Sequence, residues 1–83
     1  MSEEELFLQQ IGQRIMERRK KLGLTQEALA EKGDVTTQFV SYAEAGKRAM
    51  RPENLLKIAS ALGVSTDYIQ HPSQTPWSLS TQR

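Results

Sequence analysis

The segment from Thr36 to Arg48, TTQFVSYAEAGKR, is rich in hydrogen-bonding side chains and nearly free of charge until its last two residues. It begins with a residue that favours the helix N-cap and reaches a glycine after about three turns, which predicts a helix. At about 100° per residue, one arc of this helix carries only uncharged residues, namely Thr37, Gln38, Ser41, Tyr42 and Ala45. A solvated helix usually carries Lys and Glu on such a face. Neutral donors and acceptors can instead distinguish binding partners by their hydrogen-bonding pattern.

The first of the helices that must position this face is predicted to run from a capping box at Ser2 and Glu5 to Leu22, and to end at Gly23. Its inward face is expected to hold four apolar residues, Leu8, Ile11, Ile15 and Leu22. Of the basic run at 18–21, we expect only Arg19 to point inward.

Three further helices complete the predicted framework. Each starts with a residue suited to a helix N-terminus, Thr25, Pro52 and Ser65. The first of them spans 26–32 and the second ends at Gly63, while Tyr68 and Ile69 of the last are expected to close the core. No strand pattern appears. The sequence therefore predicts a compact, all-α domain of five helices.

The helix over 26–32 and the uncharged helix are separated by the turn Gly33-Asp34-Val35, which is the spacing of a helix-turn-helix. In this motif the second helix lies in the major groove of DNA and the first crosses the backbone. Gln can bind purine edges with two hydrogen bonds, Ser and Thr donate or accept, and the carbon atoms of Thr, Ala and Tyr suit thymine methyl groups. The basic loop at 46–51 would attract phosphates irrespective of base sequence. These features predict double-stranded DNA as the partner.

The segment LTQEALAEKGDVTTQFVSYAEAGKR resembles the Cro and lambda-repressor class of helix-turn-helix domains, often called the xenobiotic-response-element type. The resemblance covers residues 11–69. Several separate markers carry it, namely Thr25-Gln26, Leu29-Ala30, Val35, Glu44-x-Gly46 and Leu62-Gly63-Val64. It implies a lambda-repressor-like fold and a sequence-specific transcriptional regulator that acts on double-stranded DNA.

The resemblance also implies roles for individual residues. Positions that face the bases are occupied by Thr37, Gln38, Ser41 and Tyr42. Positions that contact the sugar-phosphate backbone are occupied by Thr25, Gln26, Thr36, Lys47, Arg48 and Arg51. Gln26 is further implied to buttress the recognition helix. Arg19 and Glu44 match a buried ion pair that ties the first helix to the third.

Some residues depart from the usual pattern of this family. Gly33-Asp34 stands where a small residue followed by glycine is usual, and Arg18 stands where leucine is usual. Phe39 replaces a small or polar residue and is expected to pack or to contact a partner, not to read bases. Tyr42 replaces a more usual Arg, Lys or Gln. We expect these departures to affect the base preference and not the fold.

Composition narrows the class of protein further. The chain has 83 residues and a net charge of +1, with three glutamates at 3–5 and most of its cations between 14 and 51. It has no cysteine and no apolar run near the roughly 20 residues of a membrane span, which predicts a cytoplasmic protein without a thiolate metal site. A single histidine, His71, and the lack of a glycine-rich loop leave no groups for an active site. We therefore expect neither an enzyme nor a cofactor.

Residues 1–70 are expected to form the DNA-binding domain, and residues 71–83 a polar tail with too few apolar residues to fold alone. We expect a homodimer that binds a palindromic operator. The surface that joins the two copies is expected at the last two helices, near Val64, Thr66 and Ile69. Leu6, Phe7 or Trp77 would add an apolar anchor.

Two functions remain open from the sequence. The leading interpretation is a dedicated regulator, a repressor of a phage, plasmid, mobile element or restriction system, without a ligand domain and hence without a small-molecule ligand. The alternative is an antitoxin whose tail binds a toxin while the helical domain autoregulates the operon.

Overall fold

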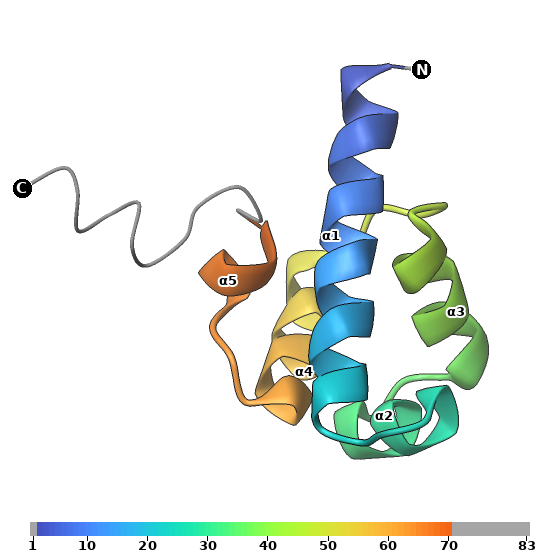
Figure 1. Cartoon of the computed structure of the whole chain (residues 1–83), viewed down its shortest axis with the longest axis vertical. Helices are drawn as coiled ribbons and strands as arrows, with labels where there is room; N and C mark the ends of the chain where they lie inside the picture. The colour runs from blue at the N-terminus through green and yellow to red at the C-terminus, as the bar shows by residue number, and fades with distance from the viewer. Residues whose placement is uncertain (1, 71–83) are drawn as a thin grey trace, which may run out of the picture.

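The computed structural model describes residues 2–70, and these form five helices (Figure 1). In chain order they are α1 Glu3–Lys21, α2 Gln26–Gly33, α3 Thr37–Ala45, α4 Pro52–Leu62 and α5 Thr66–Gln70. The predicted all-α fold of five helices is confirmed, and the described part of the chain contains no strand. Residue 1 and residues 71–83, which include the predicted tail with His71 and Trp77, lie outside the described residues.

α1 is the longest helix and organises the others (Figure 1). In Figure 1, α3 lies on one side of α1, α4 and α5 lie on the other, and α2 crosses near its C-terminal end. α3 packs against both α1 and α2, while α2 also packs against α4. The recognition helix of the predicted motif is therefore supported from two sides and keeps its outer face open.

Side chains cap the first three helices where the sequence predicts. Ser2 accepts a hydrogen bond from the backbone N–H of Glu5, and the Glu5 carboxylate accepts one from the backbone N–H of Ser2, which confirms the capping box. Thr25 and Thr36 each accept from the backbone N–H three residues further on. Gly46 ends α3 with a left-handed backbone at φ 72°. These contacts fix where the two helices of the motif begin and where α3 ends.

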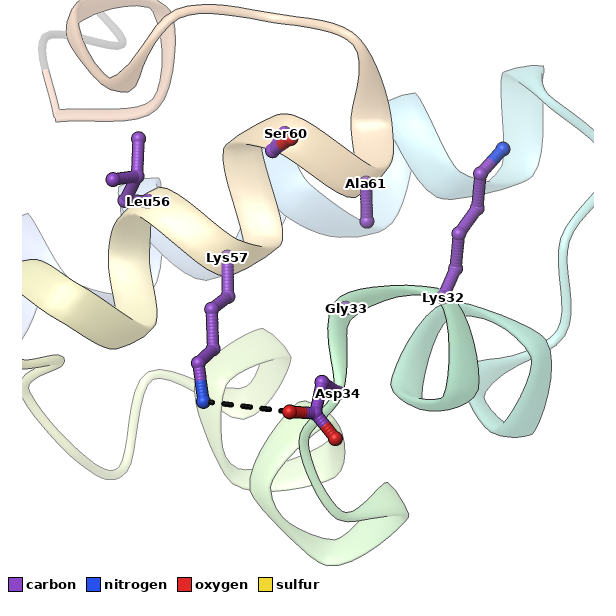
Figure 2. A pocket seen from close by; sticks show the side chains of 7 residues that line it. All are labelled: Lys32, Gly33, Asp34, Leu56, Lys57, Ser60 and Ala61. Atoms are coloured by element: carbon purple, nitrogen blue, oxygen red, sulfur yellow. Dashed lines mark ion pairs between the residues drawn. The ribbon is translucent and has the colours of Figure 1, made fainter.

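The turn between α2 and α3 places its left-handed backbone at Asp34 and not at the preceding glycine. Asp34 has φ 58° and is, among residues 2–70, the one residue other than glycine with a positive φ. Gly33 is still helical and lies against α4, where an added Cβ would be 3.4 Å from the Lys57 carbonyl oxygen. Figure 2 shows the Asp34 carboxylate near the Lys57 ammonium group, at 3.9 Å. Gly33 thus allows α2 to pack closely against α4, and Asp34 adopts the left-handed backbone of the turn.

A single apolar core joins the helices. Its buried members are Ile11, Ile15, Leu29, Ala30, Val40, Ala43, Leu55, Ile58, Ala59, Ala61, Leu62 and Ile69. Phe39 packs partly buried against this core, as the sequence predicts. No helix within residues 2–70 is both long enough and apolar enough to cross a bilayer.

Two residues predicted to face the core are exposed instead. Leu22 is 42% exposed because it lies past the last turn of α1, at the C-cap position, where it no longer follows the helical face. Tyr68 is 39% exposed because it lies on the outer side of α5. Its ring is covered by the Arg14 guanidinium, whose central carbon lies 4.6 Å from the ring centroid. Ile69 alone provides the contribution of α5 to the core.

Arg18 corrects the expectation that only Arg19 in the basic run points inward. Its side chain is half-buried, and its Nε donates a hydrogen bond to the Leu62 carbonyl oxygen at 3.1 Å. Leu62 is the last residue of α4, where carbonyl groups lack helical partners and the helix dipole is negative. A guanidinium at this point is therefore a cap for α4 supplied by α1.

α1 and α3 approach each other at a pair of glycines. A Cβ added to Gly12 would collide with the carbonyl groups of Ala43 and Glu44 in α3. A Cβ added to Gly46 would lie 2.7 Å from the Cα of Gln9 in α1. The missing side chains thus let the C-terminal half of α3 lie directly on the backbone of α1.

Candidate nucleic-acid interface

The outer face of α3 carries the predicted base-reading residues. Thr37, Gln38 and Ser41 are exposed, and Tyr42 is half-buried. The opposite face of the helix is buried through Val40 and Ala43. Because the apolar residues anchor one side of α3, the four polar residues share the side that faces away from the protein.

Two of these polar side chains contact each other. The Gln38 Nε2 donates a hydrogen bond to the Tyr42 hydroxyl at 3.1 Å. The two residues are one helical turn apart, so their side chains project from the same face. This contact was not predicted from the sequence, although the i, i+4 spacing of a glutamine and a tyrosine is a signal that points to it.

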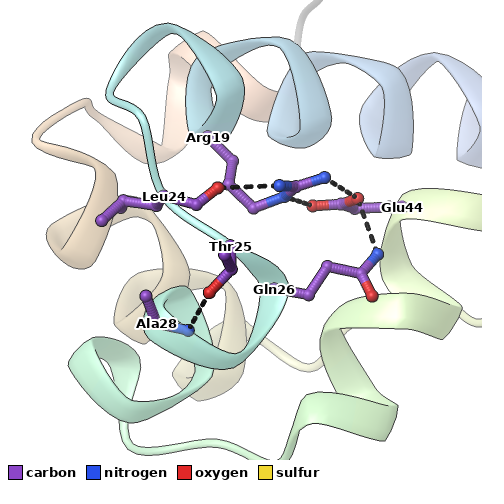
Figure 3. A network of polar contacts seen from close by, with 6 residues as sticks. All are labelled: Arg19, Leu24, Thr25, Gln26, Ala28 and Glu44. Atoms are coloured by element: carbon purple, nitrogen blue, oxygen red, sulfur yellow. Dashed lines mark hydrogen bonds and ion pairs between the residues drawn. The ribbon is translucent and has the colours of Figure 1, made fainter.

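A buried ion pair fixes the position of α3 relative to α1. The Arg19 Nε lies 2.6 Å from the Glu44 Oε2, and its Nη2 donates to the Glu44 Oε1 at 3.1 Å (Figure 3). The Arg19 residue is only 9% exposed. The hydrogen bonds to Glu44 raise the pKa of the Arg19 guanidinium above its ordinary value, although burial acts in the opposite direction. The pair has the two-point geometry that makes arginine–carboxylate contacts directional.

The same carboxylate also reaches α2. The Gln26 Nε2 donates to the Glu44 Oε1 at 3.0 Å, and the Arg19 Nη1 donates to the Leu24 carbonyl oxygen at 2.8 Å (Figure 3). Glu44 therefore connects the end of α3 to the start of α2 and to the last turns of α1. Gln26 occupies the buttressing position that the resemblance implies, with one N–H directed at Glu44 and a second remaining for another acceptor.

The predicted phosphate-binding residues surround the ends of the two helices. Thr25 and Thr36 are exposed, and each uses its oxygen to cap a helix while its hydroxyl proton remains a donor. Lys47, Arg48 and Arg51 are exposed in the loop that follows α3. The structure therefore places hydroxyl donors at the starts of α2 and α3 and exposed cations in the loop that follows α3. Residues 2–70 contain no cluster of His, Asp or Glu that would suit a metal ion.

The surface expected to join two copies is only partly available. Val64 and Thr66 are half-buried, but Ile69 is completely buried in the core and cannot contact a second subunit. The prediction that Ile69 closes the core is confirmed, because α5 uses that side chain to pack on the rest of the domain, so Ile69 offers no surface to a second copy. Leu56 on α4 is 61% exposed and was not predicted, since it lies outside the apolar stripe of that helix.

The comparison with protein families is decisive for this fold. A family model described as helix-turn-helix matches residues 15–69. The chain belongs to this helix-turn-helix family. The match spans α2 and α3 together with their supports in α1, α4 and α5, so it includes the predicted reading face and the Arg19–Glu44 pair.

Two curated relatives illustrate the family. The helix-turn-helix domain is 37% identical over 59 residues to the HTH-type transcriptional regulator ImmR of Bacillus subtilis, covering 71% of this chain and 46% of that protein. It is 39% identical over 61 residues to the repressor protein C2 of Salmonella phage P22, covering 74% of this chain and 28% of that protein. The chain thus spans less than half the length of either relative.

Solved structures support the same fold. The restriction-modification controller protein C.AhdI from Aeromonas hydrophila aligns with a TM-score of 0.73 and 35% identity, over 75% of this chain and 94% of that one. The P22 c2 repressor, in complex with a synthetic operator, aligns with a TM-score of 0.69 and 39% identity, over 71% and 89%. The prediction of a lambda-repressor-like helix-turn-helix fold is confirmed.

Proposed function

We propose that this protein is a transcriptional regulator, acting as a repressor in the cytoplasm, that binds double-stranded operator DNA with α3 in the major groove. The observation that carries this proposal is the exposed, uncharged face of α3 bordered by the cations of the following loop. The relatives named as a transcriptional regulator and as a repressor protein support it. No observation favours the antitoxin alternative.

The chemistry of each side chain indicates whether it contacts bases or phosphates. Thr37, Gln38, Ser41 and Tyr42 present neutral donors and acceptors, which distinguish base edges in the major groove. The cations, hydroxyl groups and one amide around them contact phosphates and set the position of the helix, namely Thr25, Gln26, Thr36, Lys47, Arg48 and Arg51. Since phosphate contacts carry no base information, the specificity resides on α3.

We further propose that two copies bind a palindromic operator. One α3 helix spans only a few base pairs, whereas two copies bind half-sites about 34 Å apart, or a multiple of that distance. Candidate surface for a second copy comes from Leu56, which is 61% exposed on α4, and from the half-buried Val64 and Thr66, which lie just before and at the start of α5. Such a small surface suits a dimer that is weak in solution. On DNA the two copies are held side by side, and the resulting high effective concentration favours their association.

Selection of bound sequences from a random duplex pool tests this function. We expect a two-fold symmetric site, and an affinity whose log–log dependence on salt concentration has a slope on the order of −4 to −8 per dimer. Sedimentation with and without the selected duplex reports the dimer. Equal binding to every duplex, or a slope near zero, would refute the proposed function. A monomer that gains nothing from a second half-site would refute only the dimer.

A further inference from the structure

The hydrogen bond between Gln38 and Tyr42 bears on which base the protein reads. Gln38 is the second residue of α3 and is exposed, at the end of the helix that approaches base edges in this motif. Tyr42 is half-buried, so its phenol group has fewer positions available than an exposed side chain has. The contact therefore places an exposed amide against a more constrained hydroxyl, at 3.1 Å.

The direction of this bond determines what the amide can still offer. A glutamine amide carries two N–H donors and one carbonyl acceptor. With one N–H directed at the Tyr42 hydroxyl, the amide keeps one donor and one acceptor side by side. In the major groove, adenine presents the complementary pair, an acceptor at N7 and a donor at N6.

The opposite amide orientation would give a different preference. If the carbonyl oxygen of Gln38 accepted a hydrogen bond from the tyrosine hydroxyl, both N–H groups would remain. Two donors complement guanine, which presents acceptors at N7 and O6. In the structure Nε2 contacts the hydroxyl, which is the amide orientation that complements adenine.

We infer that Tyr42 is a positioning residue that orients the Gln38 amide and thereby selects adenine at one position of each half-site. This inference rests on the proposed function and names the base that the site recognises. A tyrosine hydroxyl can accept the amide N–H, whereas Arg and Lys side chains have no acceptor.

The test combines the selected operator with two variants and a modified base. We expect adenine at one fixed position per half-site, and an affinity loss of roughly 10-fold when guanine replaces it. Replacing that adenine by 7-deazaadenine removes the N7 acceptor and should weaken binding of the unmodified protein, but not of Gln38→Ala. Tyr42→Phe removes only the hydroxyl, so it should reduce the discrimination between adenine and guanine several-fold at this position alone.

Matched controls separate positioning from folding. Ser41→Ala lies on the same face and should alter a different base position, while thermal unfolding and the salt dependence of Tyr42→Phe should match those of the unmodified protein. Selection of guanine or a pyrimidine at the Gln38-dependent position would overturn the inference, as would full adenine preference in Tyr42→Phe. Failure to bind any duplex specifically would instead refute the proposed function.

Discussion

Gly12 in α1 lies directly against the backbone carbonyl group of Glu44 in α3, with no space for a side-chain carbon between them. The contact lies next to the Arg19–Glu44 ion pair, so the same end of α3 is held by its backbone and by its side chain. The orientation of the reading face thus depends on the distance between two helix backbones as well as on polar contacts.

Gly12→Ala should therefore lower the free energy of unfolding by about 1–3 kcal/mol, because a backbone cannot give way as a flexible side chain can. Chemical denaturation measures this change. Gly33→Ala is the matched control, since Gly33 is also helical and its added Cβ would meet the Lys57 carbonyl oxygen at 3.4 Å. We expect that control to stay within about 1 kcal/mol of the unmodified protein. Equal losses in the two variants would contradict the close approach at Gly12.

The Arg19–Glu44 pair should show strong coupling. Arg19→Ala and Glu44→Ala each leave a buried charge without its partner and should destabilise the domain by about 3–5 kcal/mol. Replacing both residues by apolar ones should cost much less than the two single losses together. A double-mutant cycle measures the coupling, and additive losses would show that the two side chains act independently.

The left-handed conformation of Asp34 predicts a difference between two small replacements. Asp34→Gly should be more stable than Asp34→Ala by about 1 kcal/mol, because alanine is strained at φ 58° and glycine is not. Both variants lose the contact with Lys57, whose contribution is small because the Asp34 side chain is 95% exposed and that of Lys57 is 45% exposed. Comparison of the two variants by thermal unfolding therefore isolates the backbone term. Greater stability of the alanine variant would exclude the left-handed turn.

The capping box at the start of α1 should respond to acid. The hydrogen bonds from the Ser2 backbone and side chain hold the pKa of the Glu5 carboxyl below its ordinary value of 4.5. A lowered pKa in the folded state means that the stabilising contribution is complete above pH 4.5 and is lost as the pH falls through the folded value. An NMR titration of Glu5 should thus give a midpoint below the ordinary value for a glutamate. In Ser2→Ala the Glu5 midpoint should return toward its ordinary value.

Base and phosphate contacts should be separable by mutation. Gln38→Ala should relax the preference at one base position, at a cost of roughly 1–3 kcal/mol on the best site. Lys47→Ala should weaken binding to all duplexes alike and flatten the salt dependence by about one unit per half-site. Lys57→Ala, an exposed cation on α4 outside the predicted interface, serves as the control and should change neither property. Identical behaviour of the Gln38 and Lys47 variants would contradict the division of roles.

The sequence predicts those features whose cause is local. The caps at Ser2, Thr25 and Thr36 depend on residues three positions apart, and the inward face of α3 depends on the spacing of Val40 and Ala43. The family resemblance adds the Arg19–Glu44 pair. Local sequence patterns would not predict this pair, because the two residues are 25 positions apart.

Contacts between distant segments were missed for a physical reason. Arg18 donates to a carbonyl oxygen 44 residues further on, so nothing near it in the sequence indicates that acceptor. Ile69 was predicted both to close the core and to lie near the dimer surface, and the structure buries it completely, as the first of these predictions requires. Base contacts at Gln38 and Tyr42 remain predictions, although their mutual hydrogen bond shows that these two side chains do not act separately.

Arg18 and Arg19 are neighbours in α1, yet Arg18 donates a hydrogen bond to the last residue of α4 and Arg19 donates to Glu44 near the end of α3. Val64, on the proposed dimer surface, follows α4 by two residues. One turn of α1 thus connects the surface that would join the copies to the helix that would enter the groove. In the proposed dimer we expect these contacts to hold the angle between the two reading helices, so that binding depends on the helical phase of the two half-sites. Inserting one base pair between the half-sites rotates one half-site relative to the other by about a tenth of a turn. The two α3 helices, connected through α1, would then no longer face both half-sites at once.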